Sequence, residues 1–269
     1  MGYVDAIILG IVQGLTEFLP ISSSGHLVIF QYLLGISSKN IAFEVIVHFG
    51  TLLSIVAVYY IDIWHMIKSF FGGITHRNIG KTYRDDSFFR LSIFVIIGTI
   101  PAVIAGLFLK DFFVSVFHNI HLVGVTLLLT GVVILLTSYI KDRAEELTPP
   151  KSLLIGIAQS IAILPGISRS GFTISSALFM GVSRENAARF SFLLAVPAIL
   201  GATLLHIIEL TSSEISGTSV GTLFTGFIFS FIVGYIAIRF LLSILKSGKF
   251  GWFAPYCFLA GLIVLIFIK

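Results

Sequence analysis

Two serine-rich turns hold the residues of this 269-residue chain that are most able to do chemistry. The first turn follows Glu17 and contains, in order, Ser22, Ser23, Ser24, Gly25 and His26. Serine caps and a glycine turn leave backbone N–H groups and the positive end of a helix free to bind an anion. A serine hydroxyl can act as a nucleophile, and an imidazole beside it can transfer protons near neutral pH. The first turn therefore predicts an anion site with acid–base groups.

The second turn repeats this pattern and adds a fixed positive charge. It contains Ser168, Arg169, Ser170 and Gly171, with Thr173 two residues later. Ordinary helix capping can explain serines at such turns, but it does not explain an arginine within an apolar region. We expect the two helix ends, the hydroxyls and the guanidinium to converge on a multiply charged anion.

Gln13 and Glu17 are four residues apart and so lie on one face of a helix. A carboxylate at membrane depth costs roughly 2.5–3.5 kcal/mol, so it should face a wet cavity, a cation or a base. Two oxygen ligands on one face suit a hard divalent cation, Mg²⁺ or Ca²⁺. The alternative is a structural glutamate that is protonated or paired with an arginine.

The composition places these residues in a membrane. The chain is 57% hydrophobic and only 11% charged, and its mean hydropathy is +1.04. These values exclude an ordinary soluble domain. The net charge of +4 comes from bases scattered over short connections, which argues against nucleic-acid binding.

Six apolar runs are long enough to span a bilayer, and two apolar regions are broken. The runs are 42–61, 91–109, 121–140, 190–208, 223–242 and 253–268. The broken regions are 4–35 and 152–182, which contain the two serine-rich turns. Each half of a broken region is too short to span ~30 Å of hydrocarbon. We predict that each forms a re-entrant hairpin, which enters and leaves on one side.

The two broken regions resemble each other at an offset of 146 residues. The run 10–13, Gly-Ile-Val-Gln, matches 156–159, Gly-Ile-Ala-Gln, and the two serine turns match in the same register. The chain thus reads as one integral membrane domain with repeats of about 1–147 and 148–269. Each repeat has a hairpin and three spans, an odd number, so the second repeat should be inverted.

Basic residues set the expected orientation. Connections on one side carry Lys68, Arg77, Lys81, Arg84, Lys141, Arg143, Lys151, Lys246 and Lys249, whereas the other side has Lys39, Lys110 and Lys269. The positive-inside rule then places both termini outside the cytoplasm. The hairpins should enter from opposite sides of the membrane. Their turns should meet inside the protein, because lipid cannot form hydrogen bonds with the N–H and C=O groups of non-helical backbone.

The motifs of both turns resemble the signatures of one known family. Gln13-x-x-x-Glu17, the run 17–26 (Glu-Phe-Leu-Pro-Ile-Ser-Ser-Ser-Gly-His) and the run 165–173 (Pro-Gly-Ile-Ser-Arg-Ser-Gly-Phe-Thr) are similar to those of the undecaprenyl-diphosphatase family, also called the bacitracin-resistance protein family. The resemblance covers nearly the whole chain. The family pattern admits Glu or Gln at its first position, and here Gln13 leaves Glu17 as the sole anionic metal ligand.

The resemblance implies a function and a site. It implies hydrolysis of undecaprenyl pyrophosphate to undecaprenyl phosphate and phosphate at the outer face of the bacterial cytoplasmic membrane, which recycles the lipid carrier for peptidoglycan synthesis and confers bacitracin resistance. The catalytic residues it implies are Glu17, His26, Ser23 and Arg169. We expect Ser22, Ser24, Gly25, Ser168, Ser170, Gly171 and Thr173 to bind the substrate, and Glu17 and Gln13 to hold the divalent cation.

Three questions stay open at the level of sequence. Ser23 can attack the terminal phosphorus with help from His26, or a water activated by His26 or Glu17 can attack directly. A lipid-phosphate flippase or transporter is the competing function, because inverted repeats with broken helices are also a transporter architecture. The sequence also allows a homodimer.

Overall fold

The described chain is built from helices. The structure, a computed structural model, describes residues 1–36, 41–75, 79–116, 119–141, 143–209 and 219–267. The helices are α1 (Tyr3–Phe18), α2 (Ser23–Leu33), α3 (Ile41–Thr75), α4 (Ile79–Asp85), α5 (Ser87–Phe108), α6 (Lys110–Val116), α7 (Ile120–Leu136), α8 (Pro149–Ile161), α9 (Arg169–Phe179), α10 (Arg184–Glu209), α12 (Val220–Lys246) and α13 (Phe253–Phe267), with short 3₁₀ turns η1 (Thr137–Tyr139) and η2 (Phe250–Trp252).

Within the described residues, six helices are long and apolar enough to cross a bilayer. They cover Ala42–Thr75, Ser87–Phe108, Ile120–Tyr139, Arg184–Leu205, Val220–Lys246 and Phe250–Phe267. Large apolar side chains on these helices are exposed, as at Phe108 and Phe267, because lipid rather than water is their solvent. The predicted set of six spans is confirmed, and the protein is an all-helical, multi-pass membrane protein.

The third helix is longer than the hydropathy pattern predicts. The predicted span covered 42–61, but α3 continues to Thr75 and α4 occupies Ile79–Asp85. The apolar run ends where charged side chains begin, and the helix continues because its backbone hydrogen bonds do not depend on hydropathy. A kink lies at Tyr59, which has φ −111° and ψ 23°. Three basic residues that entered the orientation prediction, Lys39, Arg77 and Lys269, lie outside the described residues.

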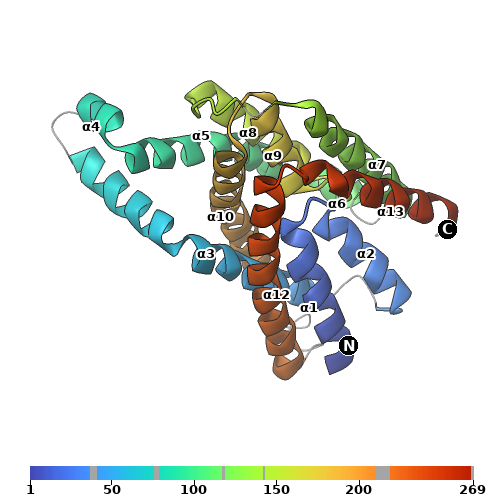
Figure 1. Cartoon of the computed structure of the whole chain (residues 1–269). Coiled ribbons are helices and arrows are strands. Elements are labelled where there is room, and N and C mark those ends of the chain that lie inside the picture. Colours follow the sequence, from blue (N-terminus) through green and yellow to red (C-terminus); the bar gives the residue numbers. More distant parts are fainter. Residues whose placement is uncertain (37–40, 76–78, 117–118, 142, 210–218, 268–269) are drawn as a thin grey trace.

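The helices pack in pairs that join the two halves of the chain. Helix α1 lies along α12, which also packs on α3, while α8 lies along α5, and α10 contacts α3, α5 and α9. Helices α7 and α13 pack side by side, and α3 runs outward to α4 on the far side of the molecule (Figure 1). The short pairs α1–α2 and α8–α9 thus each pack on a longer helix from the other half of the chain.

Small residues allow the closest of these helix contacts. A Cβ atom placed on Gly156 of α8 would lie 2.2 Å from the carbonyl oxygen of Gly98 in α5. The hydroxyl of Ser152, one turn earlier on α8, donates to the carbonyl of Phe94. Helices in lipid associate through such close packing and interhelical hydrogen bonds, because apolar burial gives little driving force there. This contact fixes α8, and with it the second serine turn, against α5.

Candidate active site

The first turn has a strained backbone at Ser22. Helix α1 ends at Phe18, and Ser22 caps α2 with φ 71° and ψ 103°. Its hydroxyl accepts a hydrogen bond from the N–H of Gly25 at 3.3 Å. A positive φ at a non-glycine residue costs of order 1–3 kcal/mol and persists only where the surroundings impose it. The residue that follows this strained position is Ser23.

Glu17 is the centre of a cluster of hydrogen bonds. Its Oε2 atom accepts from the hydroxyl of Ser23 at 2.6 Å and from Nε2 of Gln13 at 2.9 Å. Its Oε1 atom lies 2.8 Å from Nη2 of Arg169, and Nε2 of His48 lies 3.8 Å from Oε2. Glu17 is only 7% exposed, so the guanidinium is what compensates a charge that would otherwise be buried alone.

The second turn holds Arg169 against the first. Ser168 caps α9 by accepting from the N–H of Gly171 at 3.0 Å. The hydroxyl of Ser170 donates to the carbonyl of Leu19 at 3.3 Å. A Cβ atom on Gly25 would meet Cα of Gly166 at 3.2 Å, so the two turns lie directly against each other.

Helix α7 forms hydrogen bonds with the backbone of the second turn. The hydroxyl of Thr126 donates to the carbonyl of Pro165 at 2.6 Å. The hydroxyl of Thr130 donates to the carbonyl of Gly166 at 3.3 Å and accepts from the N–H of Ser168 at 3.2 Å. The non-helical backbone of this turn is therefore bonded to protein, as its position in a membrane requires.

Five of the expected substrate-binding hydroxyls make hydrogen bonds within the protein itself. Those of Ser22 and Ser24 lie 3.4 Å apart, and those of Ser168 and Ser170 lie 3.2 Å apart. The hydroxyl of Thr173 lies 2.5 Å from that of Ser191 and also donates to the carbonyl of Arg169 at 2.7 Å. Thr173, one turn after Arg169 on α9, thus joins α9 to α10.

His26 bonds to residues other than Glu17 and Ser23. Its Nδ1 atom is 2.7 Å from the carbonyl oxygen of Ser22, and its Nε2 atom is 2.7 Å from the hydroxyl of Tyr256. The acceptor of the Ser23 proton in this arrangement is Glu17, rather than the imidazole. Glu17, Ser23 and Arg169 therefore form one bonded group, and His26 belongs to a second group that contacts the same turn.

The motifs of the two turns include neither Tyr256 nor His48. Tyr256 lies in an apolar span 230 residues after His26, and its only signal is a phenol among apolar side chains. His48 lies one turn after Glu44 on α3. Its ring reaches Glu17 from a helix that motif reasoning did not connect with the turns.

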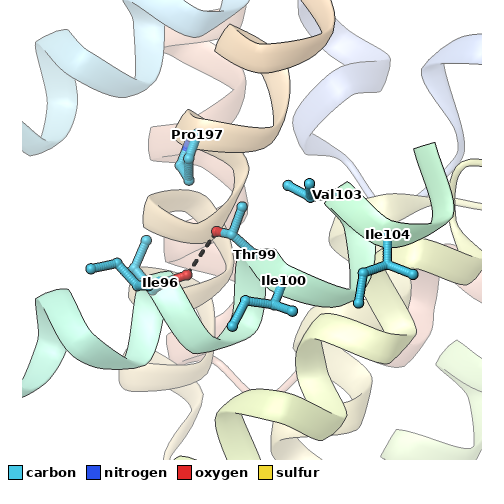
Figure 2. Close-up of a pocket in the computed structure, with 7 residues that line it drawn as sticks. Ile96, Thr99, Ile100, Val103, Ile104 and Pro197 are labelled. Atoms are coloured by element: carbon cyan, nitrogen blue, oxygen red, sulfur yellow. Dashed lines mark hydrogen bonds between the residues drawn. The ribbon is translucent and has the colours of Figure 1, made fainter. Parts of the chain in front are cut away.

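Two cavities adjoin α10 on different faces. A small one of about 10 Å³ is lined by Glu17, Phe18, Arg169, Ser170, Ser191, Phe192 and Ala195. A larger groove of about 340 Å³ is lined by Val95, Ile96, Thr99, Ile100, Val103, Ile104 and Pro197. Figure 2 shows the groove between α5 and the Pro197 turn of α10; the hydroxyl of Thr99 is turned onto the carbonyl of Val95, 2.7 Å away. The groove surface is therefore apolar, and the polar cavity has room for about one water molecule.

The chain is similar to known proteins along almost all of its length. Residues 6–263 match the family model described as bacitracin resistance protein BacA. An undecaprenyl-diphosphatase from Korarchaeum cryptofilum is 43% identical over 265 residues, which cover 98% of this chain and 99% of the relative. An undecaprenyl-diphosphatase from Halothermothrix orenii is 40% identical over 274 residues, which cover 99% and 98% of the two chains. The sequence resemblance is confirmed, and this chain belongs to the bacitracin resistance protein BacA family.

Proposed function

We propose that this protein hydrolyses undecaprenyl pyrophosphate to undecaprenyl phosphate and inorganic phosphate. The observation that carries the proposal is the bonded group of Ser23, Glu17 and Arg169, in which a hydroxyl donates to a buried carboxylate that an arginine also contacts. This group combines a nucleophile, a base and a cation for phosphate. The names of the relatives, undecaprenyl-diphosphatases, supply the substrate class.

The phosphates would bind where the two turns meet. Helices α2 and α9 both begin there, so their free N–H groups and positive ends converge on one place. The polar cavity holds only about 10 Å³, and Glu17 occupies one side of Arg169. An incoming diphosphate therefore competes with Glu17 for the guanidinium. Binding would free Glu17 to act as a base while Arg169 neutralises the phosphate charge.

The reaction would then proceed in two displacements. Glu17 takes the proton of Ser23, and the serine oxygen attacks the terminal phosphorus while the bond from phosphorus to the bridging oxygen breaks. Undecaprenyl phosphate leaves with the proton from Glu17, which is then a carboxylate again. Glu17 next takes a proton from a water, and the water oxygen attacks the phosphoserine while the bond from phosphorus to the serine oxygen breaks. The serine oxygen takes the proton back from Glu17, and inorganic phosphate leaves with Ser23 restored. Direct attack by water on the substrate is the competing course.

A divalent cation stays part of the proposal. The Oε1 atom of Gln13 is buried and has no hydrogen-bond partner, and it lies on the residue whose amide contacts Glu17. Among the described residues there is no group of three or more His, Cys, Asp and Glu side chains that could hold a metal. Gln13 and Glu17 fit a cation that takes its remaining ligands from water and phosphate oxygens, as Mg²⁺ does. Such a cation would neutralise phosphate charge.

We also infer the membrane arrangement that the sequence predicted. The pairs α1–α2 and α8–α9 would be re-entrant hairpins of two inverted repeats. The reciprocal packing of the first hairpin on α12 and the second on α5 supports this inference. The bias of basic residues supports extracytoplasmic termini, with the site reached from the outer face. The prenyl chain would lie between spans, for which the apolar groove of α5 and α10 is a candidate. A homodimer remains compatible with this arrangement, although the site residues all come from one chain.

Trapping the covalent intermediate tests the proposal. Purified protein is mixed with a prenyl pyrophosphate that carries a radioactive terminal phosphate, quenched in acid after a short time and digested. We expect label on the peptide that contains Ser23 and none in Ser23→Ala, which should also lose phosphate release. Full activity in Ser23→Ala would exclude the serine mechanism. Phosphate release without a labelled wild-type peptide would favour direct attack by water.

A further inference from the structure

Tyr256 fixes the protonation pattern of His26. The carbonyl oxygen of Ser22, 2.7 Å from Nδ1, can only accept a hydrogen bond, so Nδ1 carries the proton. In the neutral ring Nε2 then has a free lone pair. The hydroxyl of Tyr256 lies 2.7 Å from Nε2 and must donate to it. One imidazole tautomer satisfies both contacts.

The contact also fixes the orientation of the imidazole ring. The rings of Tyr256 and His26 are stacked, with their centroids 5.7 Å apart and their planes 16° from parallel. His26 is 4% exposed, whereas Tyr256 is 45% exposed. The next residue, Cys257, has its sulfur 3.4 Å from the carbonyl oxygen of Pro20. Helix α13 therefore contacts the first turn through two neighbouring side chains.

The chain of contacts ends at the reacting group. The imidazole holds the carbonyl of Ser22, whose φ of 71° is the strained position of the turn. Ser23 follows directly, and its hydroxyl must reach Glu17 at 2.6 Å. A change in the peptide unit after Ser22 would move the Ser23 hydroxyl away from Glu17. A displacement of a reacting group by about 1 Å can reduce the rate by about 100-fold.

We propose that Tyr256 is a positioning residue of the phosphatase reaction: its hydroxyl holds His26 in the Nδ1–H tautomer, and His26 in turn holds the Ser22 carbonyl so that Ser23 meets Glu17. The assignment rests on the proposed function. It gives His26 a task that its geometry allows, since its ring bonds to the turn and to α13, while Ser23 bonds to Glu17.

The test removes one oxygen atom. Tyr256→Phe keeps the stacked ring and deletes the hydroxyl donor, so the packing of the ring, and any activity that depends on packing alone, should be retained. We expect kcat for phosphate release to fall by about 10- to 100-fold with little change in KM, because Arg169 and the helix ends that bind phosphate are untouched. The thermal unfolding midpoint should be unchanged. Tyr139→Phe, at a residue that is 78% exposed, is the matched control and should behave as wild type.

A spectroscopic reading separates this role from a structural one. The nitrogen-15 shifts of the His26 ring, assigned by their absence in His26→Gln, should report Nδ1–H in wild type and a mixture of tautomers in Tyr256→Phe. Wild-type kcat with an unchanged tautomer in Tyr256→Phe would overturn the proposal. The proposal would also be overturned if kcat and the unfolding midpoint both fell in Tyr256→Phe while the His26 tautomer stayed unchanged. If folded wild type releases no phosphate, the reaction role falls with the proposed function, and the tautomer still decides the contact.

Discussion

At the scale of single residues, the Glu17–Arg169 pair carries both stability and chemistry. The carboxylate is nearly inaccessible, with 3% of its side chain exposed, and the guanidinium is its charged partner 2.8 Å away. Removing one member of a buried pair typically costs ~3–5 kcal/mol, because the other charge is left alone. The pair is also the place where we propose that the diphosphate binds, in competition with Glu17 for Arg169.

A double-mutant cycle separates these two roles. Glu17→Gln and Arg169→Gln should each lower the thermal unfolding midpoint and reduce phosphate release by at least ~100-fold. The double variant should be inactive, yet its midpoint should fall by less than the sum of the two single losses, since no uncompensated charge remains. Tryptophan fluorescence during heating measures the midpoints. Additive losses would show that the two side chains contribute independently.

The sequence predicted much of this residue set. Glu17 and Arg169 were identified by their types within apolar regions, and Ser23 by the family resemblance; these three lie together. The hydrogen bond from Ser23 to Glu17, rather than to His26, could not be predicted from the sequence, because it depends on the direction in which each side chain leaves the first turn. Tyr256 was missed for a related reason, since an isolated tyrosine in an apolar span gives no signal of its partner.

At the scale of elements, helix α8 must approach α5 closely to place the second turn. The positions that permit this are Gly156 and Gly98, whose backbones leave no room for a methyl group. The resemblance of the two turns predicted a duplication. It did not predict which helices enclose them, because hydropathy in a membrane marks lipid contact and not the choice of neighbour.

Gly156→Ala tests that approach. A methyl group there overlaps the carbonyl of Gly98, so α8 must shift, at a cost of about 1–3 kcal/mol. We expect a lower unfolding midpoint and reduced phosphate release. Gly201→Ala on α10 is the control, because a methyl group there meets nothing within 4 Å and alanine favours a helix by up to ~1 kcal/mol. Equal midpoints for the two variants would contradict the packing argument.

At the scale of the whole molecule, the turns of two short helix pairs meet, and each pair packs on longer helices. The hydropathy pattern predicted six spans, and the described residues contain six helices of that kind. The pattern misplaced the end of α3, since it shows where polar residues begin and not where a helix ends. The anion site that we propose between these turns would suit a transporter as well as an enzyme. The bonded nucleophile and base, Ser23 and Glu17, are what favour hydrolysis.

The most direct test is phosphate release from undecaprenyl pyrophosphate by the purified, detergent-solubilised protein, measured beside Arg169→Gln and with and without a chelator. We expect one inorganic phosphate per lipid for wild type, little or none for Arg169→Gln, and a loss of release in chelator if the proposed cation takes part. Wild-type protein that is folded and binds the lipid, yet leaves the diphosphate intact, would contradict hydrolysis and favour a lipid-phosphate transporter.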